Sequence, residues 1–239
     1  MISIFRRQPA KVIPFHTDFG VRLFPESPDG PVTLSASIAM LKQMEAAGVV
    51  RCIAAVTVGG SNPTAHTAAA LPEWMAVLRS AAAKASITMQ LDVAGRYLLD
   101  AQFESLLASG ALLPLPGNRL LLDNSPGFTG HQLHARIFQI EMAGYKPMLG
   151  RVEHYSCFCK NKESLFLLRR CKCDLQVELL SLLGYHGFRI KWWSRYLVRN
   201  GYAKYVASGI RSETEARFVA RHLRSGACNR WLEKARPLA

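Results

Sequence analysis

Short apolar segments rich in β-branched residues alternate with longer segments of helical periodicity along this chain of 239 residues. Such alternation is typical of βαβ units, which place parallel strands in a sheet or barrel with helices outside. The predicted strands are residues 12–18, 49–58, 87–93, 119–123, 146–149, 173–177 and 205–208. The predicted helices are residues 32–47, 72–85, 100–109, 132–143, 162–170, 188–200 and 213–223. The chain is therefore predicted to have an α/β fold.

The composition is that of a chain able to bury a substantial core, with 49% hydrophobic and 20% charged residues. We predict one barrel-sized domain over residues 1–239, with an N-terminal extension at 1–11 and a C-terminal tail at 225–239. No apolar stretch reaches the roughly 18–20 residues that a membrane span needs, and the N-terminus lacks the features of a signal peptide. A cytoplasmic location is expected, with the six cysteines as reduced thiols.

Positive charge is concentrated in the C-terminal part of the chain. Residues 1–145 carry 11 basic and 10 acidic side chains, whereas residues 146–239 carry 19 and 7. The net charge is thus +1 for the first part and +12 for the second. The excess in the second part favours anionic partners, such as phosphorylated polypeptide, polyanionic glycan, nucleic acid or an acidic protein surface. Nucleic-acid binding is the weaker alternative, because the sequence contains no recognised nucleic-acid-binding module.

Residues 17–30 read TDFGVRLFPESPDG, which resembles TDFHSHLLPGIDDG with both histidines replaced. The second sequence opens the metal site of the PHP-type (polymerase and histidinol phosphatase) protein-tyrosine phosphatases of bacterial capsule and exopolysaccharide loci. GYKPML at 144–149 and SLLGYHG at 181–187 are further points of resemblance. The resemblance implies a distorted (β/α)7 TIM-like barrel. It also implies that active relatives hydrolyse phosphotyrosine with a cluster of divalent metals, manganese or iron.

The resemblance identifies the positions at which active relatives hold their metal ligands. In this chain these positions are Gly20, Arg22, Thr57, Arg96, Asp123, Arg151, Gly209 and Arg211. Asp123 is the conservative exchange, because the family has a glutamate there. The HPERY motif of the family reads RVEHY at 151–155, so that His154 stands where the family has a substrate-binding arginine.

Arginine has no lone pair to offer a metal and stays protonated in proteins. At an effective dielectric constant near 20, each guanidinium at about 5–6 Å would oppose a dication by several kcal/mol. We therefore predict that the chain uses no metal cofactor. On this interpretation it is a pseudophosphatase with a binding or regulatory role, and its family context implies a tyrosine-phosphorylated kinase tail, an active paralogue or a second copy as partner.

Two interpretations of the arginines remain open. They could be structural cross-links, paired with Asp123, Glu153, Asp29 or Asp18. Alternatively, they could form a site for phosphate or another anion, built from Arg22, Arg96, Arg151 and Arg211 together with His154, because guanidinium groups bind such anions in a bidentate manner. A weakly active, metal-dependent phosphatase using Asp123, Glu153 and His154 is the enzymatic alternative.

Other chemically suggestive residues favour ordinary roles. His16 is expected to be a surface or satisfied histidine rather than a metal ligand. Two CxC pairs, at 157–159 and 171–173, are expected to be ordinary thiols, because a helix of nine residues, about 13 Å long at 1.5 Å per residue, separates them. The aromatic residues Trp192, Trp193 and Tyr196 are expected to pack inward, with the neighbouring cations facing solvent.

Overall fold

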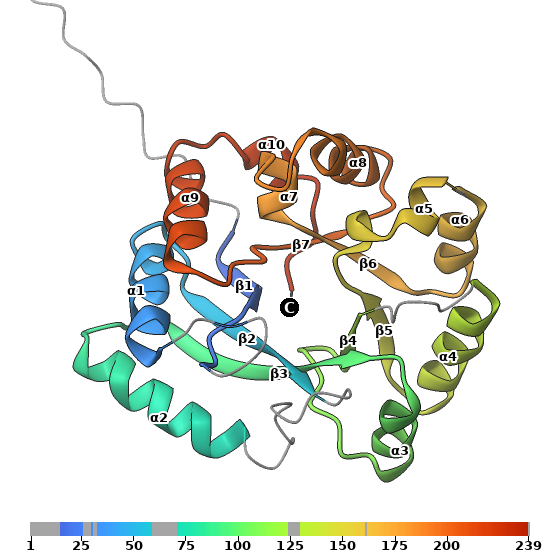
Figure 1. The fold of residues 1–239 in the computed structure, drawn as a ribbon, viewed down its shortest axis with the longest axis horizontal. Helices are drawn as coiled ribbons and strands as arrows, with labels where there is room; N and C mark the ends of the chain where they lie inside the picture. The colour runs from blue at the N-terminus through green and yellow to red at the C-terminus, as the bar shows by residue number, and fades with distance from the viewer. Residues whose placement is uncertain are drawn as a thin grey trace, which may run out of the picture.

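The polypeptide forms seven parallel strands in the order β1 to β7, curved into a nearly closed barrel with helices on its outside (Figure 1). We describe residues 15–25, 30, 33–58, 71–123, 130–160 and 162–238 of a computed structural model. The strands are β1 (Thr17–Val21), β2 (Arg51–Val58), β3 (Gln90–Leu98), β4 (Arg119–Asp123), β5 (Lys146–Leu149), β6 (Asp174–Glu178) and β7 (Tyr205–Ala207). The predicted α/β barrel is thus confirmed.

The helices lie between consecutive strands or after the last strand, and they cover the outside of the barrel. The longer ones are α1 (Leu34–Glu45), α2 (Leu71–Lys84), α3 (Ala101–Ser109), α4 (Gly130–Met142), α6 (Lys162–Arg170), α8 (Phe188–Arg199) and α9 (Glu213–Arg224). All seven were predicted, because their ends carry local signals: Asp100 accepts a hydrogen bond from Phe103 N, and Gly110 ends α3 in the left-handed conformation. The short elements η1 (Val152–His154), α5 (Ser156–Lys160), α7 (Leu179–Leu183) and α10 (Asn229–Leu232) were not predicted. None of the helices in the described ranges has the length and apolar character to cross a lipid bilayer.

Two strands differ from their predicted bounds by three residues or more at one end or both. β1 begins at Thr17 and continues to Val21, beyond the predicted end at residue 18, and residues 12–14 lie outside the described part of the chain. β3 begins later than predicted and runs on to Leu98, paired with β2 as far as Tyr97 opposite Val58. Backbone pairing extends β3 through a segment without an apolar run. Arg96 consequently lies within a strand, not in the loop after it as predicted.

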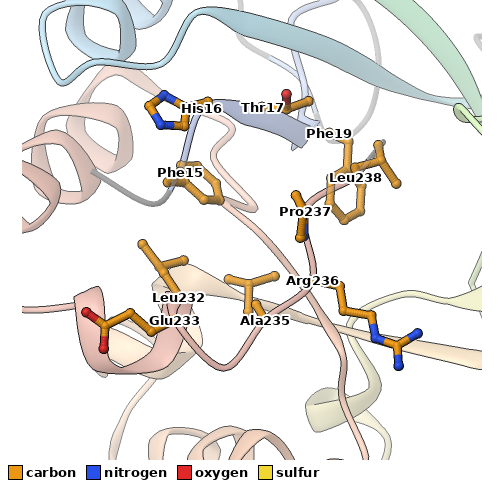
Figure 2. Close-up of a pocket in the computed structure, with 11 residues that line it drawn as sticks. Phe15, His16, Thr17, Phe19, Leu232, Glu233, Ala235, Arg236, Pro237 and Leu238 are labelled. Atoms are coloured by element: carbon orange, nitrogen blue, oxygen red, sulfur yellow. The ribbon is translucent and has the colours of Figure 1, made fainter. Parts of the chain in front are cut away.

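The C-terminal tail packs against the barrel end at which the strands begin. Leu238 is buried in the barrel interior beside Phe19, and Arg236 N donates a hydrogen bond to Lys204 O at 2.7 Å. Together with residues at the start of β1, the tail lines an open cavity of about 320 Å³ (Figure 2). His16 borders this cavity and is exposed, as predicted for a surface histidine. The tail therefore does not cover the opposite barrel end, at which the strands finish.

Asp18 joins the first strand to the last at the seam of the barrel. Its Oδ1 accepts hydrogen bonds from Ser208 N at 2.9 Å and from Gly20 N at 3.2 Å. Arg22 N also donates to Ile210 O at 3.0 Å, so that the chain beyond β1 contacts the chain beyond β7. Asp18 is fully buried, and this burial raises the pKa of its carboxyl group above the ordinary value.

Replacing Asp18 by alanine is expected to lower the free energy of unfolding by about 1–3 kcal/mol, because it leaves the buried Ser208 N–H without its acceptor. Asp18→Asn keeps the acceptor and should cost less. Since the pKa of Asp18 is raised in the folded state, its contribution to stability is largest below the unfolded pKa and falls as the pH rises through the folded value. Urea unfolding at several pH values measures the free energy of unfolding of the wild type, Asp18→Ala and Asp18→Asn. Equal stability of the alanine and asparagine variants would contradict the role at the seam.

Candidate functional site

The barrel mouth is the end at which the strands finish, where chemistry is placed in barrels of this type. Six of the eight predicted ligand positions line its central space: Gly20, Arg22, Arg96, Asp123, Arg151 and Gly209. This space has a volume of only about 20 Å³, room for roughly one water molecule. Side chains therefore fill most of the mouth.

Arg96 and Asp123 form a buried ion pair across the mouth. Arg96 Nη1 lies 3.1 Å from Asp123 Oδ2, and both side chains are less than a tenth exposed. Arg96 Nη2 also donates to Thr57 Oγ1 at 2.7 Å, while Asp123 Oδ1 accepts from Tyr155 OH at 3.2 Å. Arg151 Nε lies 3.7 Å from the same carboxylate. Four predicted ligand positions thus contact one another, as the interpretation of the arginines as cross-links expects.

A second buried pair joins Arg22 to Glu178, the last residue of β6, with Nη2 and Oε1 3.7 Å apart. Glu178 also occupies the space in front of Gly209, whose φ is +77°. A Cβ atom at Gly209 would lie 2.5 Å from Glu178 Cδ, and one at Gly20 would lie 2.7 Å from Ala207 Cβ. These two glycines therefore leave no room for a larger side chain in the present arrangement.

The remaining predicted site residues take different roles. Arg211 turns toward α9, where its backbone N–H donates to Glu215 Oε2 at 2.7 Å and its Nε lies 3.8 Å from Oε1. Glu153 is buried and accepts a hydrogen bond from Glu178 N at 2.8 Å. Burial, and then the charge of Glu178, raise the pKa of Glu153 to about 7. Asp29, another predicted partner of the arginines, lies outside the described residues.

His154, Glu178 and His186 converge beside the mouth, and we call these three residues the His–Glu–His triad. The Nε2 atoms of His154 and His186 lie 3.3 Å and 3.5 Å from Glu178 Oε2. The three potential ligand atoms all lie within 4.8 Å of one another. Burial opposes the ionisation of Glu178, but the two imidazoles, followed by Arg22 and Arg151, lower its pKa below the ordinary value.

The two histidines of the triad line a cleft of about 720 Å³ between η1 and the start of α8. We call this the aromatic cleft. It is lined by Glu153, His154, Ser156, His186, Phe188, Arg189, Ile190, Trp192 and Trp193. Trp193 packs inward as predicted, but the prediction was wrong for Trp192, which is 57% exposed. The preference of large aromatic residues for burial did not decide the position of Trp192, because helical periodicity turns it away from the core side of α8.

Sequence reasoning missed Glu178 and noted His186 only as part of a motif. The predicted sixth strand ended one residue before Glu178, so this carboxylate was not considered at the mouth. The rule that residues at the ends of barrel strands face the mouth could have identified it. The CxC pairs show no shared site among the described side chains: Cys157 is exposed, burial raises the pKa of Cys173 to about 12, and the side chain of Cys159 lies outside the described part.

The fold resembles that of a crystal structure from a study of YwqE from Bacillus subtilis and CpsB from Streptococcus pneumoniae, described as unique metal-dependent tyrosine phosphatases. The two chains are 20% identical, with a TM-score of 0.74, and the match covers 92% of this chain and 95% of the other. A D-hydantoinase from Thermus sp. is 7% identical over 95% of this chain and 67% of its own, with a TM-score of 0.50. A histidinol phosphate phosphatase from Lactococcus lactis, in complex with zinc, L-histidinol and phosphate, is 14% identical over 89% and 93%, with a TM-score of 0.49.

The prediction that the chain uses no metal cofactor is contradicted by two findings. The similar YwqE and CpsB proteins are described as metal-dependent, and the His–Glu–His triad offers three potential metal ligands in this chain. Besides the positions at which active relatives hold their ligands, the sequence argument weighed only His16 and the two CxC pairs. It did not consider ligands that different loops bring together at another place.

Comparison with curated protein sequences found no match. A family model described as capsular polysaccharide synthesis, CpsB/CapC, matches residues 16–235, which is most of the chain. The structural similarity to the chain from the YwqE and CpsB study, which covers 92% of this chain and 95% of the other, agrees with this match. The chain therefore belongs to the CpsB/CapC family of capsular polysaccharide synthesis proteins.

Proposed function

We propose that this CpsB/CapC family member is a regulatory protein that binds a tyrosine-phosphorylated polypeptide. On this proposal the barrel mouth does not hydrolyse the bound phosphotyrosine. The family context suggests the phosphorylated tail of a kinase of polysaccharide export as the partner. The observation that carries the proposal is the pair of buried arginine–carboxylate contacts, Arg22–Glu178 and Arg96–Asp123, at positions where active relatives are expected to hold metals.

A cluster of several divalent metals needs neutral imidazoles and ionised carboxylates as ligands. At the mouth, the guanidinium groups of Arg22 and Arg96 are buried in ion pairs, and the free space is about 20 Å³. The residues present there do not fit such a cluster. We therefore assign no hydrolytic step to this space.

The aromatic cleft is where we place the ligand. Its volume of about 720 Å³ falls in the range of about 300–1,000 Å³ that is usual for ligand sites. Arg189 and His154 line it together with Phe188 and Trp192. A phosphotyrosine side chain combines an anion with an aromatic ring, and this lining offers a cation for the first and an apolar wall for the second.

Binding of a tyrosine-phosphorylated peptide, followed by the fluorescence of the exposed Trp192, is expected to be stronger than binding of the unphosphorylated peptide. Arg189→Ala should weaken binding about tenfold or more, since a hydrogen bond to a charged group is worth about 1.5–3 kcal/mol. Arg217→Ala, an exposed cation on α9, is the matched control and should leave the affinity unchanged. Equal binding of both peptides would contradict the proposal.

A metal-assisted phosphatase is the second candidate, and the His–Glu–His triad is the observation that favours it. Release of phosphate from the same peptide, measured with and without added Mn²⁺, distinguishes the two functions. The first proposal expects no turnover beyond the buffer control. Sustained turnover that needs the metal and is lost in His186→Ala would favour the second candidate.

A further inference from the structure

We infer that His154, Glu178 and His186 form a mononuclear site for a divalent transition metal, zinc in particular, at the inner end of the aromatic cleft. The three ligands come from separate parts of the barrel: η1 after β5, the last residue of β6, and the turn between α7 and α8. This site is distinct from the ligand positions that the family resemblance predicts. It does not depend on whether the protein binds or hydrolyses a phosphorylated peptide.

The distances between the ligand atoms suit a tetrahedral metal. Ligand atoms at about 2.0–2.1 Å from a tetrahedral zinc ion lie roughly 3.3–3.4 Å from one another. The two observed Nε2–Oε2 distances, 3.3 Å and 3.5 Å, agree with this value. The two imidazole nitrogens are no more than 4.8 Å apart, and both rings are partly exposed, so that small ring rotations can close the remaining gap.

Two of the buried ligand atoms lack hydrogen-bond partners. Glu178 Oε2 and His186 Nε2 are shielded from solvent, and their contact does not have hydrogen-bond geometry. Leaving buried polar atoms unsatisfied is costly and uncommon. The other carboxylate oxygen of Glu178 faces Arg22, which orients the carboxylate with Oε2 toward the two imidazoles. A cation between the three side chains would satisfy both atoms.

The ligand set determines the class of metal. Two imidazoles with one carboxylate are typical of zinc sites with an open coordination position and of non-haem iron(II) sites. Mg²⁺ and Ca²⁺ prefer oxygen ligands and are not expected here. The charge of Arg22 opposes the cation, while the buried carboxyl group of Glu153, 3.8 Å from His154 Nε2, can offset it. The side facing the cleft leaves the open coordination position to water or to a bound ligand.

The test is zinc binding by the full-length protein, stripped of metal by a chelator and then titrated in competition with a fluorescent zinc chelator. Wild-type protein should bind one zinc ion per chain, and X-ray absorption should report nitrogen and oxygen ligands. His186→Ala should weaken binding at least about 100-fold, because even changes to groups that only orient ligands cost about 10–100-fold. His16→Ala, an exposed histidine at the other barrel end, should bind zinc as wild type does.

Circular dichroism establishes whether each variant folds. If His186→Ala does not fold, His154→Gln serves as the ligand variant instead. A rise in the melting temperature with zinc, present in wild type and absent in a folded ligand variant, would support the site. Unchanged zinc affinity in a folded ligand variant would overturn it, as would zinc–sulfur distances of about 2.3 Å, which indicate cysteine ligands. Because these measurements use zinc alone, they are independent of peptide binding and turnover.

Discussion

Replacing Asp123 by alanine is expected to lower the free energy of unfolding by about 3–5 kcal/mol, the usual cost of removing one partner of a buried ion pair. The carboxylate faces Arg96 at 3.1 Å and Arg151 at 3.7 Å, and it also accepts a hydrogen bond from Tyr155. Its loss would leave the buried charge of Arg96 without this counter-charge. Urea unfolding followed by circular dichroism measures the effect.

The control for this prediction is an ion pair of the same types on the surface. Glu213 and Arg217 form such a pair on α9, with side chains 38% and 65% exposed. Glu213→Ala should cost less than about 1 kcal/mol, because exposed pairs contribute little. The double variant Arg96→Met/Asp123→Leu removes both charges and should recover much of the lost stability. Similar costs for Asp123→Ala and Glu213→Ala would contradict a structural role for the pair at the mouth.

Replacing Gly209 by alanine is expected to lower the free energy of unfolding by about 2–4 kcal/mol, from backbone strain and overpacking together. Gly209 has a φ of +77°, which favours glycine, and a Cβ atom there would lie 2.5 Å from Glu178 Cδ. Either Glu178 or the backbone after β7 would have to move. The same denaturation experiment measures the effect.

Gly110 provides the matched control, because it has a similar φ of +68° but no atom within 4 Å of an added Cβ. Gly110→Ala should therefore show the backbone cost alone, about 1–2 kcal/mol. If Gly209→Ala lowers the free energy of unfolding more than Gly110→Ala does, the difference is the cost of the contact with Glu178. Equal costs would show that Glu178 can move away from the added Cβ atom. The contact explains why Glu178 and a larger residue at position 209 exclude each other in this arrangement.

The barrel itself was predictable because its signals are local. Apolar runs of strand length, helical periodicity and capping residues such as Asp100 and Gly110 each depend on a few neighbouring residues. Alternation of the two element types then leaves parallel βαβ connections as the favoured arrangement. The errors arose where local signals were weak: β3 extends through Arg96, held there by pairing with β2 and not by an apolar run.

The positions of the mouth residues were also predictable, but their partners were not. The sequence identified Arg22, Arg96, Asp123 and Arg151 as neighbours at the mouth, and the structure places all four around its central space. It did not identify Glu178 as the partner of Arg22, because the predicted strand stopped one residue earlier. The predicted strand ended at residue 177, so Glu178 was not counted among the strand-end residues that face the mouth.

The sequence by itself determined the alternation of strands and helices and predicted which residues stand at the barrel mouth. The tertiary structure decided which carboxylate each arginine faces, that the tail packs beside Phe19 at the other barrel end, and that His154, Glu178 and His186 meet. The physical reason is that strand and helix formation depends on residues close together in the chain. Ion pairs and ligand sets depend on side chains that come together only when the barrel closes.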